Sequence, residues 1–370
     1  MSLSKPGWVW IAVCVVSIGA GCVGGDENAE AQTAQAASPD QPEAVPTPEL
    51  GITLDNMPVV DSSTSAQPLA ALLVGRVLGL RMRWIPNMDG SRRRWPLLGE
   101  PGGQTVTEGT RRVSERLRQC LRTSGTHGAY VNLIRGLQHP SGPRPGGNLP
   151  RADLILVARA PSGDEIDMAR SEKVELDVRP VALDAFVFIV NSRNPVRRLT
   201  LDQIRAIYTG KITNWREVGG ADSPIRPYVR NRNSGSRELM DKLVMKGLKT
   251  IEAPDMMALS MIGPFNQIDN DRHGLGYTVY FYEKEMAPAA NPTRQKFSKK
   301  KVRRRKVLAI DGVAPTSKTI ADGTYPLATK VFVATRSDMP PDSPTVRMRD
   351  WLLTPDGQKL VAESGYVPLR

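Results

Sequence analysis

The amino-acid sequence is poor in cysteine, in aromatic residues and in long apolar runs. Of its 3 cysteines, Cys14 and Cys22 lie near the N-terminus, so the remainder of the chain holds only Cys120 and cannot form an internal disulfide or a zinc site. Aromatic residues make up 5% of the chain, and no basic and aromatic residues alternate in the way that stacks nucleic-acid bases. The longest mostly apolar stretch, Trp8 to Ala20, is shorter than the ~20 residues that a membrane-spanning helix needs.

Motifs that would indicate an enzyme are also absent. The sequence has no GxSxG elbow, no Walker A motif and no glycine-rich dinucleotide fingerprint. The segment "TGKIT" (209–213) resembles part of a phosphate loop, but Arg205 stands where the first glycine belongs. The 3 histidines show no metal-ligand spacing, and we interpret His127 as structural. We therefore expect no catalytic residue, no metal and no cofactor.

The first 21 residues have the pattern of a secretory signal peptide, with Lys5 before the apolar run and small residues up to Cys22. Small residues directly before a cysteine are typical of a lipoprotein cleavage site, so we predict that Cys22 carries a lipid anchor. Gly19 stands where such sites usually have leucine, and cleavage without lipidation near the alanine-rich stretch is the alternative. The chain is expected in the cell envelope or periplasm, attached to a membrane through the lipid.

The composition changes sharply after residue 55. Residues 23–55 contain 7 acidic residues but no Lys, Arg or aromatic residue, so we predict that residues 22–55 form a disordered acidic tether. Residues 56–370 carry 49 basic and 31 acidic residues, a net charge of +18. This body is long enough for two lobes, since single cores tend to divide beyond ~250–300 residues.

A basic body suits nucleic acid, an anionic surface or a small anionic ligand. Export and the scarcity of aromatic residues argue against nucleic acid. The densest basic run, 294–306, is interpreted as a solvated loop or the edge of a hairpin, with contact to an anionic envelope polymer as the alternative.

The segment "YVRNRNSGSRELMDKL" (228–243) places Arg230 ahead of Ser234, Gly235 and Ser236, where an amphipathic helical pattern begins. A helix start exposes unpaired N–H groups and a partial positive charge, and arginine adds a charged fork. This arrangement suits an anion, although serine at this position is also an ordinary N-cap.

Two further segments repeat this pattern. Within 56–80, the hydroxyl-rich turn 61–65 separates an extended apolar stretch from leucines at helical spacing. Within 122–136, Ser124-Gly125-Thr126 precedes a helical pattern that ends at Gly136. Hydroxyl and N–H groups therefore gather at three helix starts.

The remaining pattern alternates strands with helices. Buried strands are predicted within 151–165 and 180–195, a helix with a capping box from Thr200 to Gln203 within 199–215, and one closing helix within 344–365. This alternation indicates an α/β fold with mainly parallel sheets, one in each lobe.

Several segments, in this order, resemble those of the phosphate-binding periplasmic proteins and lipoproteins of ABC transporters. They are "DSSTSAQPL", "THGAYVNLI", "ADLILVARAPSGDE", "DAFVFIVNSRNPV", "LTLDQIRAIYTGKITNWREVGG", Arg230 with "SGSR", and "DGQKLVAESGYVPL". The resemblance runs from about Pro58 to Leu369 and rests on the ordered set rather than on any one motif.

The resemblance implies a two-lobed, type II periplasmic-binding-protein-like clamp, each lobe a mainly parallel sheet flanked by helices, closing on a buried phosphate. We place lobe 1 at about 56–185 and 324–370, and lobe 2 at about 186–323. The implied partners are inorganic phosphate or another oxyanion and an ABC permease, with no nucleic acid, and the protein is expected to be a monomer. The phosphate ligands carried over from the family are Ser63, Thr64, Ser65, Thr126, Arg230, Ser234, Gly235 and Ser236, with Ser124 a weaker match than Thr126.

Two positions depart from the family. Arg159 stands where its best-known members have an aspartate that accepts a hydrogen bond from protonated phosphate, and Arg232 replaces a frequent acidic residue. Both changes remove acceptors and add donors, so such a site could hold phosphate or sulfate. We predict that Arg159 points into the cleft as a ninth phosphate ligand. The alternative is that it turns outward or pairs with a nearby acid such as Asp61, Asp164 or Glu165.

The function that the resemblance implies is capture of inorganic phosphate for import by a permease. One alternative is an oxyanion-sensing or scaffold lipoprotein of the envelope without a transport role. Another is a basic envelope protein whose clamp no longer closes and whose Lys/Arg run binds polyanions.

Overall fold

The computed structural model describes residues 47–87, 91–96, 108–136, 150–231, 234–287 and 304–369. The predicted signal peptide, Cys22, Arg232 and residues 294–303 of the basic run lie outside these ranges. No helix within the described ranges is both long and apolar enough to span a membrane.

The end of the predicted tether lies against the body. Leu50 and Ile52 pack against the hydrophobic core. The guanidinium of Arg116 donates to the carbonyl oxygen of Leu54 at 3.1 Å. The rest of the predicted tether, 22–46, lies outside the described residues.

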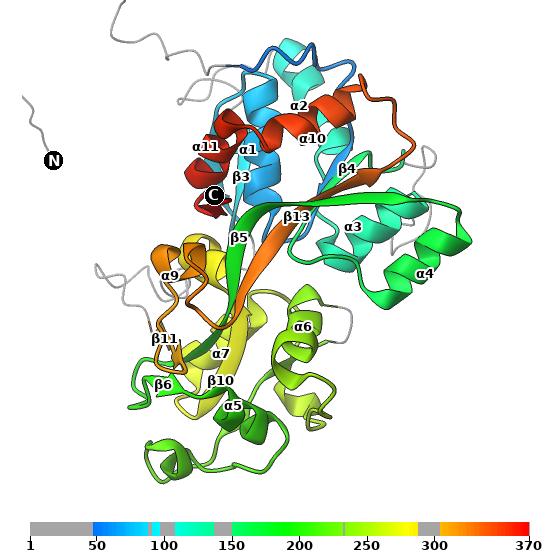
Figure 1. Ribbon diagram of the computed structural model, residues 1–370. Helices are drawn as coiled ribbons and strands as arrows, with labels where there is room; N and C mark the ends of the chain where they lie inside the picture. The colour runs from blue at the N-terminus through cyan, green and yellow to red at the C-terminus, as the bar shows by residue number, and fades with distance from the viewer. Residues whose placement is uncertain are drawn as a thin grey trace, which may run out of the picture. The chain divides into compact units, whose positions relative to one another are not determined.

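Two long strands, β5 (Leu176–Asn191) and β13 (Ala328–Arg336), organise the main sheet. In Figure 1 they run from the group of helices around α1 and α10 towards the group around α5 and α7. Residues 176–185 of β5 pair with β13, whereas residues 186–191 pair with β10 (Gly274–Val279) and β11 (Arg305–Val307). The strand changes partners between residues 185 and 186, which is where we place the boundary between the lobes. The boundary itself stays a prediction.

The sheet is mixed, which corrects the expectation of mainly parallel sheets. Its order is β1-β4-β13-β5-β10-β7, with β11 and β14 also paired to β5. The pairs β1/β4 and β10/β7 are parallel, but every pairing of β5 and β13 is antiparallel. A strand such as β13, which runs back between the two groups of helices, lies antiparallel to a neighbouring strand that runs in the forward direction. The other strands of this sheet are β1 (Val60–Ser62), β4 (Leu154–Val157), β7 (Arg226–Pro227) and β14 (Val367–Pro368).

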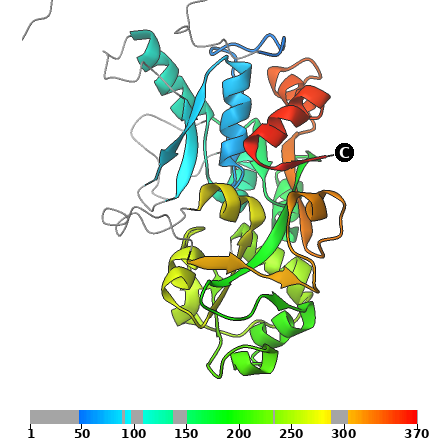
Figure 2. The same ribbon diagram turned by 90° about the vertical axis from the view of Figure 1, so that its left-hand side faces the viewer.

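Three small sheets complete the described strands. They are the hairpin of β2 (Met82–Pro86) and β3 (Arg92–Pro96), the pair β6 (Arg198–Leu199) and β12 (Ala309–Ile310), and the pair β8 (Val229–Arg230) and β9 (Met257–Ala258). Figure 2 shows the β2–β3 hairpin on one side of α1 (Gln67–Val77) and the C-terminal helices on the other. Because α1 is covered from both sides, nearly all of its residues are buried.

The described helices cover the faces of these sheets. The remaining α-helices are α2 (Glu108–Cys120), α3 (Gly125–Ile134), α4 (Gly163–Ser171), α5 (Leu201–Tyr208), α6 (Gly235–Leu239), α7 (Gly263–Asn270), α9 (Ser317–Ala321), α10 (Pro344–Leu352) and α11 (Pro355–Ser364). Short 3₁₀ turns are η1 (Trp215–Val218) and η3 (Pro254–Met256), and π-helical turns are η2 (Met240–Met245) and η4 (Tyr282–Met286).

Local signals fixed several helix ends as predicted. Thr200 caps α5 and forms the capping box with Gln203, and Gly210 follows that helix with φ +79°. The single closing helix was wrong, because it is divided into α10 and α11. Thr354 acts as a new N-cap and Pro355 lacks the N–H that would continue the first helix.

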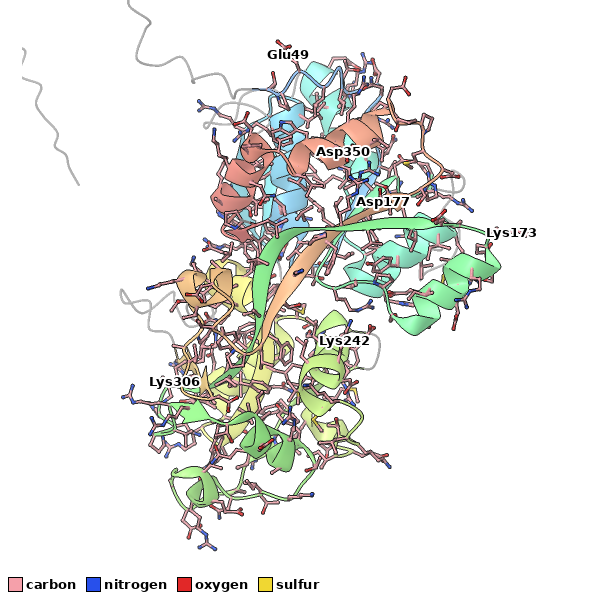
Figure 3. All side chains as sticks on the ribbon, in the orientation of Figure 1. Glu49, Lys173, Asp177, Lys242, Lys306 and Asp350 are labelled. Atoms are coloured by element: carbon pink, nitrogen blue, oxygen red, sulfur yellow. The ribbon has the colours of Figure 1, made fainter. Side chains whose placement is uncertain are left out.

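The C-terminal helix α10 is tied to the start of β5 by ion pairs. Figure 3 shows Asp177 and Asp350 close together at this junction. Arg349 Nη1 donates to Asp177 at 2.7 Å and Arg179 Nη1 donates to Asp350 at 3.0 Å. These ion pairs join segments that are far apart in sequence, since Arg349 and Asp177 are separated by 172 residues.

Asp184 lies in β5 directly before the strand changes partners. Its side chain is 3% exposed, and its Oδ1 accepts from the backbone N–H groups of Ala185 and Phe281. Burial raises the pKa of Asp184 from its ordinary value of 3.8 to about 7, and the two hydrogen bonds only partly oppose this shift.

This carboxyl should make stability depend on pH. Between about pH 4 and 7 the folded protein keeps a proton on Asp184 that the unfolded chain has lost, so the free energy of unfolding should fall as the pH rises through this window. Asp184→Asn should remove this contribution. Urea denaturation of both proteins at several pH values measures the free energy of unfolding. If the difference in this free energy between wild type and Asp184→Asn stays constant from pH 4 to 7, the raised pKa of Asp184 is contradicted.

Candidate functional site

The structure gathers eight of the nine predicted ligands around one cavity of about 410 Å³. The eight are Ser63, Thr64, Ser65, Thr126, Arg230, Ser234, Gly235 and Ser236. A larger cavity, about 750 Å³, lies beside the end of α7, and its lining mixes two carboxylates, Asp269 and Asp271, with the arginines Arg193, Arg272 and Arg304. The smaller cavity has no carboxylate among its lining residues, and it is the one that suits an anion.

Three helix starts converge on this cavity. Ser63 to Ser65 precede α1, Ser124 to Thr126 begin α3, and Ser234 to Ser236 begin α6. Each start contributes N–H groups without an intrahelical partner and the positive end of a helix dipole. The segments come from positions about 60 and 110 residues apart in the chain, and their convergence makes the cavity electropositive.

Arg230 supplies the full positive charge. It ends β8, is 5% exposed, and is held by its backbone N–H donating to Tyr277 Oη and its Nη1 donating to the carbonyl oxygen of Ser260. Its Nε is buried without a hydrogen-bond partner. No carboxylate among the described residues lies within ion-pair distance, and burial lowers the pKa of Arg230. A buried guanidinium without a counter-ion indicates that a bound anion completes the site.

Gly235 allows two of the helix starts to approach each other. A Cβ atom at position 235 would lie 2.7 Å from Thr126 Oγ1, closer than real Cβ contacts. Glycine is therefore required by the close approach of α6 to α3 rather than by an unusual φ angle.

The hydroxyl groups differ in how much hydrogen-bonding capacity remains. Ser234 Oγ accepts from Arg237 N at 3.1 Å, so Ser234 is also the ordinary N-cap of α6, but its own hydrogen is left for a ligand. Ser63 and Ser65 face each other with a long oxygen–oxygen distance of 3.4 Å. Ser236 makes only a weak contact to Met261 Sδ. These hydroxyls can donate to an oxyanion.

Ser124 is engaged differently. Its hydroxyl donates to Asp61 Oδ2 at 2.8 Å, and Asn132 donates to the same oxygen at 2.6 Å. Burial raises the pKa of Asp61, and the hydrogen bonds from Asn132 and Ser124 oppose that shift. Ser124 therefore orients the start of α3 instead of offering a free hydrogen to the cavity.

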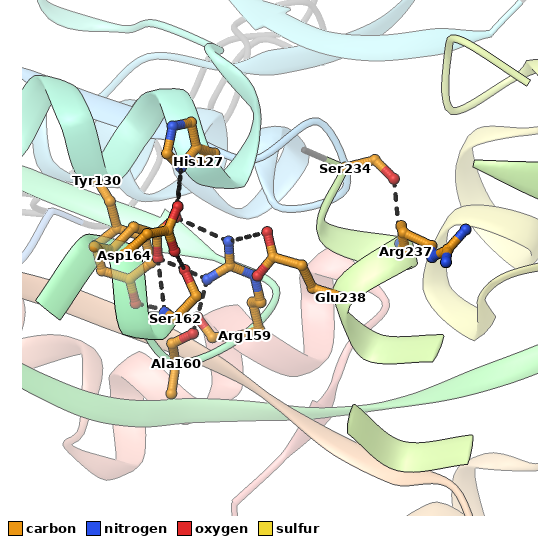
Figure 4. Close-up of polar contacts among 10 residues, drawn as sticks. His127, Tyr130, Arg159, Ala160, Ser162, Asp164, Ser234, Arg237 and Glu238 are labelled. Atoms are coloured by element: carbon orange, nitrogen blue, oxygen red, sulfur yellow. Dashed lines mark hydrogen bonds and ion pairs between the residues drawn. The ribbon is translucent and has the colours of Figure 1, made fainter. Parts of the chain in front are cut away.

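Arg159 is the ninth predicted ligand, and the structure corrects its position. It does not line the cavity of the other eight. Figure 4 shows its guanidinium beside Glu238, and Glu165 also accepts hydrogen bonds from it. Arg159 Nη1 and Nη2 donate to the two carboxylate oxygens of Glu165 at 2.7 and 2.8 Å, and Nη2 also donates to Glu238 at 2.8 Å. Two carboxylates already meet its charge, which is the alternative that the sequence left open.

His127 was interpreted as structural, yet it lines the cavity. It is the third residue of α3, and its Nδ1 lies 3.0 Å from Glu165 Oε1. Asn231 also lines the cavity and was not predicted. The signal that could have drawn attention to both was their position directly beside Thr126 and Arg230 in the quoted motifs.

The comparisons with known proteins agree with this architecture. A family model described as a PBP superfamily domain matches residues 103–352, more than half of the chain, so the chain belongs to the PBP superfamily. The predicted periplasmic-binding-protein class and the two-lobed α/β fold are thereby confirmed.

The individual relatives are distant. Protein SphX of Synechococcus elongatus is 24% identical over 301 residues, which cover 78% of each chain. The phosphate-binding protein PstS of Bacillus subtilis is 27% identical over 210 residues, 55% of this chain and 63% of its own. Similar solved structures include a Clostridium perfringens protein with bound phosphate (TM-score 0.54, 18% identity, 84% of this chain and 98% of the other). An ABC-type phosphate transport receptor from Vibrio cholerae has a TM-score of 0.51 and 21% identity, covering 85% of this chain and 99% of its own.

Proposed function

We propose that the protein is an exported solute-binding protein that captures inorganic phosphate between its two lobes for ABC-type import. The observation that carries the proposal is the buried, unpaired guanidinium of Arg230 at a cavity where three helix starts and their hydroxyls converge. The names of the relatives, phosphate-binding proteins of several bacteria, support phosphate among the oxyanions that such a cavity could hold.

Calorimetric titration of the purified full-length protein with phosphate, sulfate, arsenate and molybdate tests this proposal. We expect saturable phosphate binding with a stoichiometry of one, because the eight lining residues form a single cavity. Arsenate should bind similarly, since it has the same shape and the same protonation pattern. The proposal would be overturned if none of the four oxyanions gave a binding heat in the titration or raised the melting temperature of the protein.

Attachment to a membrane is a further part of the proposal and is supported by the sequence around Cys22. A lipid on Cys22 would keep the body at the membrane surface, and residues 23–46 would provide reach to a permease. Cys22→Ser should move the protein to the soluble envelope fraction, and unchanged membrane fractionation of that variant would argue against lipidation.

A further inference from the structure

We propose that His127 is the hydrogen-bond acceptor that lets this cavity distinguish protonated phosphate from sulfate, and that Arg159 and Glu165 position it. The inference rests on the proposed function, because it concerns the choice between anions at the same cavity. It gives Arg159 a role through two intervening side chains rather than by direct contact with the ligand.

The contacts form a chain that ends at the cavity. Arg159 donates two parallel hydrogen bonds to the Glu165 carboxylate, which is fully buried. Oε1 of the same carboxylate lies 3.0 Å from His127 Nδ1. His127 is 28% exposed at its side chain and lines the cavity. The guanidinium therefore fixes the carboxylate, and the carboxylate fixes the imidazole ring.

This chain determines which ring nitrogen carries the proton. A carboxylate paired with arginine only accepts hydrogen bonds, so Nδ1 must be the N–H that donates to Glu165. In a neutral imidazole the other nitrogen, Nε2, is then an acceptor. Nε2 makes no hydrogen bond to the described residues, because the contacts of this ring to them run through Nδ1 to Glu165 and, at 3.9 Å, to Asp164.

The hydroxyl groups that line the cavity can either donate or accept, so they do not select against sulfate, whereas an imidazole Nε2 or an amide Oδ1 can only accept. Asn231 lines the cavity as well, and its Oδ1 is buried without a hydrogen-bond partner, so it is the competing acceptor that a variant at position 231 tests. The lining residues include no carboxylate, and Arg159 is not among them. The acceptor role is assigned to His127 Nε2, because His127 lines the cavity and its side chain is 28% exposed, whereas Asn231 Oδ1 is buried.

An acceptor at this place separates two similar ions. Hydrogenphosphate retains a proton at neutral pH and can donate it to Nε2. Sulfate has no proton to donate, so its oxygen would meet the lone pair of Nε2 and both acceptors would stay unsatisfied. A site built to receive a hydrogen bond disfavours the ligand that cannot provide one.

The test compares phosphate and sulfate dissociation constants at about pH 8, where an ordinary imidazole is neutral. In His127→Leu the ratio of the sulfate to the phosphate constant should fall at least about tenfold. His127→Gln, which keeps an acceptor oxygen, should retain part of the selectivity. His273→Leu is the matched control, because His273 lines the other cavity and its loss should leave the ratio unchanged.

The positioning role needs a second comparison. The double substitution Arg159→Leu with Glu165→Leu removes both partners of the buried pair, and Glu238, which also loses Arg159, has a side chain that is 26% exposed and can be solvated. Without Glu165 the ring can present an N–H to the cavity, and the ratio should fall towards that of His127→Leu. Adding His127→Leu to the double variant should then change the ratio little further.

The outcomes separate the inference from the proposed function. If wild type binds neither anion, the proposed function fails. If phosphate binds but His127→Leu keeps the wild-type ratio, or weakens both anions by the same factor, the inference is overturned. A ratio that responds to Asn231→Leu instead would assign the acceptor to Asn231.

Discussion

Arg230→Ala should weaken phosphate binding by at least about tenfold, and Arg230→Lys should restore only part of the loss. Arg230 is 5% exposed, its Nε has no partner, and no described carboxylate pairs with its guanidinium, so a bound phosphate is the group that its charge can meet. Arginine can offer two parallel N–H bonds to one oxyanion, whereas lysine keeps the charge but loses the fork. Calorimetric titration of the three proteins measures the effect.

A matched control lies four residues earlier. Arg226 is 56% exposed at its side chain, contacts Asp271 at 3.6 Å and does not line the cavity. Arg226→Ala should bind phosphate like wild type at moderate salt, because exposed charges are largely screened. If Arg230→Ala and Arg226→Ala both bind like wild type, the cavity is not the phosphate site.

Gly235→Ala should also weaken phosphate binding, by about tenfold, without removing any hydrogen-bonding group. The new Cβ atom would meet Thr126 Oγ1 at 2.7 Å and Thr126 Cβ at 3.3 Å, so either the Thr126 hydroxyl must rotate away or the start of α6 must shift from the start of α3. Donors from both helices would then no longer reach the same anion. The free energy of unfolding should fall as well, by ~1–3 kcal/mol, which is typical of overpacking.

Gly163→Ala provides the comparison for this substitution. Gly163 also stands at a helix start, that of α4, but a Cβ atom there has no neighbour within 4 Å. The control should therefore leave both phosphate affinity and unfolding unchanged within a small margin. Equal losses in the two variants would show that the contact with Thr126 is not their cause, because alanine favours a helix more than glycine does and helix propensity cannot account for a loss.

The local parts of the site could be predicted because short stretches of sequence determine them. A serine at an N-cap and glycine after the last helical turn act through the backbone within a few residues. Ser234 at the start of α6, and Thr200 with Gln203 at the start of α5, lie where their motifs placed them. The buried strand β4 likewise follows from an uninterrupted apolar run.

Other features could not be predicted from such windows. Whether β13 runs parallel or antiparallel to β4 and β5 depends on the path of the chain between these strands, and the hydrophobic pattern carries no information about that path. The break between α10 and α11 was visible as Thr354-Pro355, but the continuous helical periodicity on both sides outweighed that signal. His127 had no catalytic or metal-binding partner in the sequence, and its neighbour Glu165 comes from a different helix.

The sequence by itself determined which residue types stand at each helix start, and therefore that this protein carries the components of an anion site. Only the tertiary structure decided which of these components meet. Eight predicted residues from three separate segments line one cavity, while Arg159 turns to Glu165 and to Glu238, which is 79 residues away. The physical reason is that backbone conformation follows from near neighbours, whereas the direction of a buried charged side chain follows from the opposite charge that folding brings beside it.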